Sequence, residues 1–412
     1  MLGLLDAFDD VLVKPFMPDG SVITLDICVL LGLARLDMLD LYVALFRPLQ
    51  KLLTDVFWAI VHPYALRLAP PFDDPVSTFN LFAKKGSLRL GTSAVLVQTV
   101  NQNLYLKFRS HLMTMHSTPA HGTYPMLFSF FDEFQKLRRN AFERQVEAAI
   151  LSGASGVAVL GLATEVSKLS SSERRSAIEW VIQAVKGRVP VAVTVADGNV
   201  SDMIDSAQFA ERAGANWLIL QPPRPPASGA DLIKFFGSVA DRVTIPVGIQ
   251  NAPEFLGIGL TPTEFITLAD QHPNVQIAKA ECSAVMVKQL IDTVGDRLRV
   301  FNGRAGLELV DNFRAGVHGM IPGIEVIDLQ VSVERAIREG RESEAEAHYA
   351  TMLPAITFAM QGIAHLVQYA KLIAAYRLGI APSVDRIPAD KATEFGKAIA
   401  RRLADQLGQL PG

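Results

Sequence analysis

Lys279 is the residue of this sequence whose position most clearly suggests chemistry. It ends the apolar run Val275–Lys279 and is followed by Ala280 and Glu281. A lysine at the end of a buried strand must leave water, which favours the neutral amine over the ammonium. A neutral amine can attack a ketone and form a Schiff base. The alternative from this segment alone is a surface lysine whose stem lies on apolar neighbours.

Two other predicted strand ends carry groups that could bind or react with a substrate. The segment Gly161–Val166 offers a glycine that lets a ligand approach the backbone, together with the hydroxyl of Thr164 and the carboxylate of Glu165. The alternative is a turn that caps the next helix. Arg224 lies in a proline-rich loop and could bind an anionic substrate, or it could be a solvated loop arginine.

Later strand ends add amides, a carboxylate and a second guanidinium. Gln250 and Asn251 could orient a carbonyl group, or they could only satisfy loop backbone. Glu281 follows the lysine by two residues and so lies nominally on the same face. Arg304 follows Gly303 after another strand. Two arginines and one lysine at these ends favour a substrate that bears a carboxylate.

The composition narrows the class of protein. The chain has 412 residues, of which 50% are hydrophobic, with a formal net charge of −3, so no basic excess indicates nucleic-acid binding. Two cysteines argue against a disulfide framework, and we expect a reducing cytoplasm. Acidic residues at the N-terminus argue against a secretory signal, and charges interrupt every long apolar run, so we expect no membrane span. No nucleotide motif or metal-ligand spacing is present, so we expect no metal and no cofactor.

The chain changes character near residue 113. Residues 1–112 are leucine-rich, show no repeating pattern of strands and helices, and receive no fold prediction. Met113–Pro119 reads like a natural start that leads directly into a strand. Three hypotheses stay open for residues 1–112: an upstream extension that was wrongly included, a poorly ordered appendage, or a real accessory domain.

From Thr123 onward, short β-like runs alternate with amphipathic helical segments, which is typical of a parallel sheet covered by helices. Eight such units predict a (β/α)8 TIM barrel over residues 113–325, with the active site at the carboxyl ends of its strands. Residues 326–412 predict a C-terminal helical subdomain. The predicted strands are Tyr124–Ser129, Val157–Gly161, Val191–Ala196, Trp217–Gln221, Val247–Gln250, Val275–Lys279, Arg299–Asn302 and Gly319–Pro322.

From about Thr123 onward, the sequence resembles the dihydrodipicolinate synthase/N-acetylneuraminate lyase family of class I aldolases. The resemblance rests on five segments: Phe128–Asp132, Gly161–Glu165, Gln250–Pro253, Ile277–Glu281 and Phe301–Gly303. It implies a pyruvate-type Schiff base on Lys279, a barrel with a helical C-terminal subdomain, and a homo-oligomer, either dimer or tetramer. Carried over by position, the segment from Gly161 through Ala163 to Thr164 would line the carboxylate site, and Gly303 would lie beside the keto acid.

This sequence departs from the family pattern at informative positions. Leu162 and Ala163 stand where the family usually has two hydroxyl residues, and Gln250 replaces a tyrosine that shuttles protons. An amide cannot replace a phenol as acid or base. We therefore expect a divergent lyase that acts on a 2-oxo acid, with Glu165 or Glu281 among the groups that could transfer protons. Two alternatives stay open: an authentic 4-hydroxy-tetrahydrodipicolinate synthase, and a barrel that binds a keto acid without catalysis.

Overall fold

The computed structural model describes residues 120–223, 228–389 and 391–412. The predicted extension, residues 1–112, and the predicted substrate-binding residue Arg224 both lie outside the described residues. The described residues belong to one compact unit in which strands and helices alternate.

Eight parallel strands form the centre of the fold, in the order β1-β8-β7-β6-β5-β4-β3-β2. The sheet closes through Met126, which bridges Ala158 in β2 and Gly323 after β8. The prediction of a (β/α)8 barrel is confirmed. The strands are β1 Gly122–Thr123, β2 Val157–Val159, β3 Val191–Val195, β4 Trp217–Leu220, β5 Val247–Asn251, β6 Val275–Ala280, β7 Arg299–Asn302 and β8 Gly319–Met320.

The first strand lies before its predicted range, Tyr124–Ser129, and the last strand is shorter than predicted. Each is followed closely by a proline, Pro125 and Pro322, which has no N–H to donate to a strand ladder. The pairing therefore continues as single hydrogen bonds, from the N–H of Tyr124 to the carbonyl oxygen of Met320 and from the N–H of Met126 to that of Pro322. The residues at this seam still lie side by side, although the regular strands end early.

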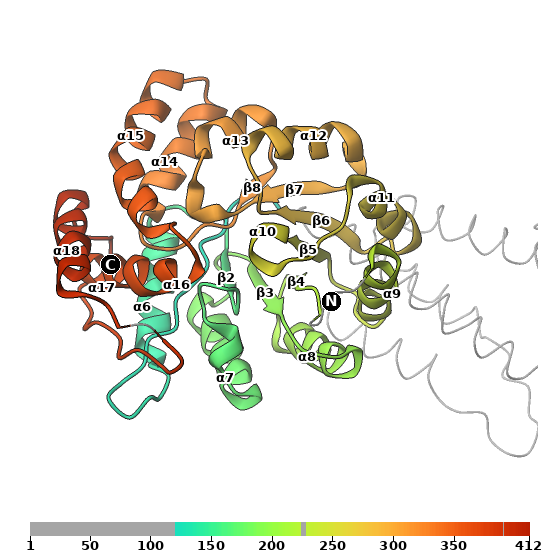
Figure 1. Cartoon of the computed structure of the whole chain (residues 1–412), viewed down its shortest axis with the longest axis horizontal. Helices are drawn as coiled ribbons and strands as arrows, with labels where there is room; N and C mark the ends of the chain where they lie inside the picture. The colour runs from blue at the N-terminus through green and yellow to red at the C-terminus, as the bar shows by residue number, and fades with distance from the viewer. Residues whose placement is uncertain (1–119, 224–227, 390) are drawn as a thin grey trace, which may run out of the picture. The chain divides into compact units, whose positions relative to one another are not determined.

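A helix follows each strand and covers the outside of the barrel (Figure 1). Some of these helices begin with a capping box, for example Ser170 with Glu173 and Thr261 with Glu264. The outer helices are α6 Arg139–Leu151, α7 Ser171–Val185, α8 Val200–Ala213, α9 Gly229–Ala240, α11 Pro262–Gln271, α12 Ala284–Val294, α13 Leu309–Ala315 and α14 Ile327–Arg338.

The remaining helices gather beside the barrel, next to α6 and α14 (Figure 1). An uninterrupted helix over Ala355–Arg377 is expected from the pattern, but the chain breaks at residues 360–362, where Gly362 has φ 158°. The helices are α15 Glu342–Ala359, α16 Ile363–His365, the π-helix η5 Leu366–Ala370, α17 Lys371–Leu378 and α18 Glu394–Leu407. Because α14 is the eighth outer helix, the extra helices begin at α15, whereas the predicted division falls at residue 325.

No single helix among the described residues is long and apolar enough to cross a membrane. Of these helices, α15 and the segment Ile363–Leu378 together have the length and composition of a span, but they are bent by 109° relative to each other.

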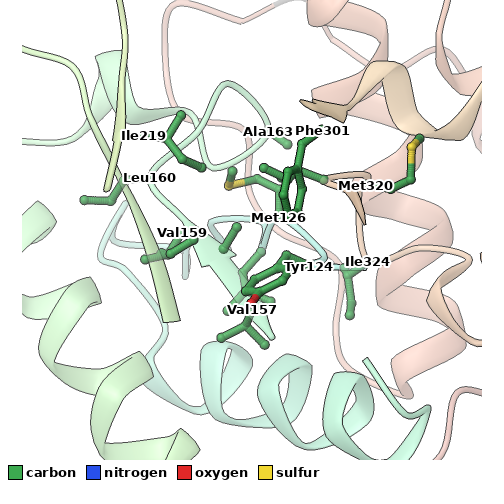
Figure 2. Packing of buried hydrophobic residues seen from close by; sticks show 14 of the residues in the cluster. Tyr124, Met126, Val157, Val159, Leu160, Ala163, Ile219, Phe301, Met320 and Ile324 are labelled. Atoms are coloured by element: carbon green, nitrogen blue, oxygen red, sulfur yellow. The ribbon is translucent and has the colours of Figure 1, made fainter. Parts of the chain in front are cut away.

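Aromatic side chains fill the inside of the barrel. Tyr124, Trp217 and Phe301 come from three separate strand positions, and their ring centroids lie 5.5 to 6.1 Å apart. Figure 2 shows Tyr124 and Phe301 close together, with Met126 beside them. Gly319 makes room for this cluster, because a Cβ there would lie 2.4 Å from Phe301 Cε1. The packing of these rings shows that Tyr124, Trp217 and Phe301 face the inside of the barrel.

Candidate active site

Lys279 lies on the inner face of the barrel near the carboxyl end of β6. Its register partners are Gln250 on β5 and Phe301 on β7, and Phe301 faces inward. Residues paired in register share a face of the sheet, so the lysine side chain also points into the barrel. Only 3% of Lys279 is exposed. An ammonium in this position needs an acidic partner.

Glu281 supplies that partner. Its Oε1 lies 2.5 Å from the Nζ of Lys279, and 5% of the residue is exposed. The backbone N–H of Glu281 donates to the carbonyl oxygen of Asn251 at 2.8 Å, which continues the pairing of β5 with β6. A Cβ added to Gly303 would lie 3.0 Å from Glu281 Oε1, so the glycine after β7 leaves space for this carboxylate. The fold therefore brings Lys279, Glu281 and Gly303 together at the mouth of the barrel.

Two amides extend the polar group across the barrel mouth. Gln250 Nε2 donates to Glu281 Oε1 at 3.1 Å, and Gln221 Nε2 donates to Gln250 Oε1 at 2.9 Å. Both glutamines are buried. Sequence reasoning missed the part played by Gln221. Its only signal was an amide immediately after an apolar strand.

The loop after β2 is held by hydrogen bonds to the segment after β1. The hydroxyl of Thr164 donates to the carbonyl oxygen of Leu127 at 2.6 Å, and Ser129 donates to the carbonyl oxygen of Thr164 at 2.6 Å. Gly161 packs against Met126, because a Cβ there would lie 2.5 Å from the methionine Cε. Ala163 is buried in the same loop. The hydroxyl of Thr164 thus uses its proton to hold the loop in place, and its oxygen can still accept a hydrogen bond.

Glu165 is engaged by two lysines of its own. Its Oε1 lies 2.5 Å from Lys371 Nζ on α17, and its Oε2 lies 2.7 Å from Lys168 Nζ. Among the described residues, no hydrogen bond or ion pair joins Glu165 to Lys279. The two predicted catalytic carboxylates therefore differ: one contacts the barrel lysine and the other ties the β2 loop to α17.

The remaining predicted binding residues also have structural partners. Asn251 accepts from the N–H of Leu260 at 2.7 Å and donates to its carbonyl oxygen at 3.0 Å. The guanidinium of Arg304 lies 3.1 Å from Glu308 and 3.7 Å from Glu254. These contacts shape the loops after β5 and β7.

Two further titratable groups near these strand ends have shifted pKa values. Burial raises the pKa of the Cys282 thiol to about 11, which disfavours the nucleophilic thiolate. Burial also raises the pKa of Glu325, in the loop after β8, to about 7. Among the described residues, neither side-chain oxygen of Glu325 has a hydrogen-bond partner, and the residue is fully buried. Sequence reasoning missed Glu325, since nothing local distinguishes it from a surface acid.

The sequence model of the dihydrodipicolinate synthetase family matches residues 119–395. The Escherichia coli K12 protein YagE, provisionally named a 2-dehydro-3-deoxy-D-gluconate aldolase, is 30% identical over 238 residues, which cover 56% of this chain and 79% of YagE. An L-2-keto-3-deoxyarabonate dehydratase of Azospirillum brasilense is 28% identical over 252 residues, covering 59% of this chain and 81% of the dehydratase.

Solved structures agree with these sequence matches. The crystal structure of E. coli YagE in complex with pyruvate superposes with a TM-score of 0.66 at 28% identity, covering 70% of this chain and 99% of YagE. A Ruminococcus gnavus sialic acid aldolase gives a TM-score of 0.65 at 20% identity, covering 70% of this chain and 95% of the aldolase, which supports the fold alone.

Proposed function

The chain belongs to the dihydrodipicolinate synthetase family, and from that premise we propose that it forms a Schiff base between Lys279 and pyruvate or another 2-oxo acid. Members of this family are lyases that act on 2-oxo acids, and they include aldolases and dehydratases. The observation that carries the proposal is the buried Lys279 ammonium 2.5 Å from Glu281 Oε1, inside the mouth of a barrel. Barrels of this kind carry their active sites at this face.

In the proposed reaction, Glu281 takes a proton from Lys279, and the neutral Nζ then attacks the ketone carbon of the 2-oxo acid. A C–N bond forms as the carbonyl π bond breaks, and one proton passes from the attacking nitrogen to the oxygen, which becomes a hydroxyl. The proton held by Glu281 then passes to this hydroxyl, which leaves as water, so that a protonated imine remains and Glu281 is ionised again. The imine accepts the electron pair left on the adjacent carbon when that carbon loses a proton or a C–C bond to it breaks; from there a C–C bond can form, or a C–O bond at the next carbon can break.

We assign proton transfer to Glu281 and not to Glu165. Glu281 touches the nucleophile, whereas both oxygens of Glu165 are occupied by the ammonium groups of Lys371 and Lys168. A proton acceptor must lie within hydrogen-bond reach of the proton it takes. Gln250 cannot act as the acid or base, because an amide does not titrate in this range.

The 2-oxo acid and the bond that reacts are a second part of the proposal. The relatives include an aldolase, a dehydratase and 4-hydroxy-tetrahydrodipicolinate synthases, and YagE is described in complex with pyruvate. We place pyruvate or a sugar-derived 2-oxo acid first, because Gln250 stands where the synthases carry a tyrosine. Authentic 4-hydroxy-tetrahydrodipicolinate synthase activity is the second candidate, and binding of a keto acid without turnover is the third.

We further propose that the enzyme needs no cofactor beyond the covalent imine, acts in the cytoplasm and assembles as a homodimer or homotetramer. The buried lysine supplies the electrophilic catalysis itself, which supports the first point. The family resemblance and the low cysteine content support the other two.

The test is chemical trapping. The protein is incubated with pyruvate, reduced with borohydride and digested, and the peptides are analysed by mass spectrometry. We expect an adduct on the Lys279 peptide and none on the Lys371 peptide, which provides a matched control because Lys371 is equally buried at 3% exposure. Absence of an adduct with pyruvate and with a panel of sugar-derived 2-oxo acids would reject the enzyme proposal. Turnover by Lys279→Ala would reject the assignment of the lysine.

A further inference from the structure

Three polar side chains from the ends of neighbouring strands form one line of hydrogen bonds that ends at the lysine. Gln221 follows β4, Gln250 belongs to β5, and Glu281 follows β6. The line runs from Gln221 Nε2 to Gln250 Oε1 at 2.9 Å, and from Gln250 Nε2 to Glu281 Oε1 at 3.1 Å. All three residues are more than nine-tenths buried.

The carboxylate fixes the direction of this line. An ionised carboxylate can only accept, so Gln250 must turn its Nε2 toward Glu281. The Oε1 of Gln250 then faces Gln221, which in turn must present its own Nε2. Each amide therefore points its positive end toward Glu281, although an isolated amide could adopt either orientation.

We propose that Gln221 and Gln250 are positioning residues that hold Glu281 Oε1 against Lys279 Nζ as the proton acceptor. This inference rests on the proposed Schiff base at Lys279. Gln250 acts directly on the carboxylate, and Gln221 acts only through Gln250. In this arrangement, Gln250 serves the catalytic carboxylate in place of the substrate contact predicted from sequence.

The hydrogen bond from Gln250 has two consequences for the carboxylate. It restrains one oxygen at the lysine, and it stabilises the charged form relative to the protonated form. Loss of a single neutral donor corresponds to about half to one pH unit in the protonation of its acceptor. Removing the donor should therefore shift the acid side of the reaction profile upward by about that amount.

Methionine and glutamate substitutions test this arrangement, because both keep nearly the shape of glutamine. The readout is borohydride trapping of pyruvate on the Lys279 peptide between pH 5 and 9. Gln250→Met should move the acid limb to higher pH by about half to one unit, and Gln221→Met by less in the same direction. The double variant should match Gln250→Met, because Gln221 has no effect once Gln250 is gone.

Gln221→Glu gives the sharpest contrast. An ionised glutamate at position 221 can only accept hydrogen bonds, so the amide of Gln250 would lie between two carboxylates. Its Nε2 can donate toward one of them, and its Oε1 would then be repelled by the other. Trapping should fall further than in Gln221→Met, although the side chain has the same length. Gln208→Met on α8, outside the barrel, is the control and should leave the profile unchanged, since Gln208 donates to the backbone carbonyl of Arg242, away from the strand ends.

A second readout does not depend on the 2-oxo acid. Trace acetylation of Lys279 with acetic anhydride, followed across the same pH range, reports how firmly Glu281 holds the ammonium. Without the amide donor, Glu281 Oε1 is less restrained, but its charge is shared with one donor fewer and attracts the ammonium of Lys279 more strongly, so acetylation should rise at higher pH in Gln250→Met. An unshifted acetylation profile in Gln250→Met, or additive effects in the double variant, would overturn the positioning role. If the unaltered protein forms no adduct, the Schiff base fails, and the acetylation profiles still decide the role of the amides.

Discussion

Lys371 on α17 lies 2.5 Å from Glu165 in the loop after β2, and the two residues are 206 positions apart in the sequence. Both are at least nine-tenths buried. The carboxylate also contacts Lys168, so it balances two ammonium groups at the edge of the barrel mouth. Through this ion pair, a helix outside the barrel fixes a loop that the family resemblance assigns to the substrate carboxylate.

Lys371→Met should destabilise the protein strongly, because it leaves Glu165 with one ammonium in a buried position. Breaking a buried ion pair costs about 3–5 kcal/mol. The double variant Lys371→Met with Glu165→Gln should recover part of that loss, since no buried carboxylate remains at this position. Urea unfolding followed by circular dichroism measures both changes. Lys397→Met at the exposed Glu394 pair should leave the urea midpoint nearly unchanged, and an equal effect at both lysines would contradict the argument.

Glu281→Gln should slow formation of the pyruvate adduct on Lys279 by about 10²–10³-fold, because the amide keeps the shape but cannot accept the proton. Glu165→Gln should slow it far less, since that carboxylate contacts Lys371 and Lys168 instead of the nucleophile. The initial rate of borohydride trapping measures both variants. A larger loss of trapping rate in Glu165→Gln than in Glu281→Gln would mean that Glu165, and not Glu281, accepts the proton.

Features encoded by neighbouring residues could be predicted from the sequence. The capping boxes at Ser170 and Thr261 join residues three apart, and the alternation of apolar runs predicted eight strands, seven of which overlap the observed ones. The proximity of Lys279 and Glu281 could also be predicted, because residues two apart at a strand end share a face. The contact between them follows from that local geometry.

Features that depend on packing between distant segments could not be predicted. Gln221 meets Gln250 only because β4 and β5 pair in a particular register, and Lys371 meets Glu165 only after the C-terminal helices pack beside the barrel. The break at Gly362 was missed because the apolar pattern continues across it. Burial of an acid such as Glu325 is likewise a property of the assembled fold.

Glu325 should make the stability of the protein fall as the pH rises. Burial raises the pKa of this carboxyl from its ordinary 4.5 to about 7, so the folded chain binds the proton more tightly than the unfolded chain. The protonated carboxyl therefore gives its full stabilisation below about pH 4.5, and this stabilisation is lost as the pH rises through about 7. The loss corresponds to roughly 3 kcal/mol for a fully buried group.

Glu325→Gln should remove this dependence, because an amide does not titrate. The difference in unfolding free energy between the variant and the unaltered protein should move in favour of the variant by roughly 2–3 kcal/mol between pH 4.5 and pH 8. Urea unfolding at several pH values measures it. A difference that stays constant across this range would mean that Glu325 is ionised in the folded protein at every pH tested.

Gly319→Ala should disrupt the inside of the barrel, because the added Cβ would lie 2.2 Å from the carbonyl oxygen of Gly122 and 2.4 Å from Phe301 Cε1. The carbonyl belongs to β1, which pairs with β8 at this residue, and the ring packs against Trp217, so neither can withdraw easily. We expect a loss of about 3 kcal/mol in unfolding free energy, as for severe overpacking of a core. Gly198→Ala, where a Cβ would meet open space, is the matched control and should leave the thermal midpoint unchanged or slightly higher. Equal midpoints for the two variants would mean that β1 and β8 can separate enough to admit a methyl group, and the aromatic cluster would then not fix the barrel at this seam.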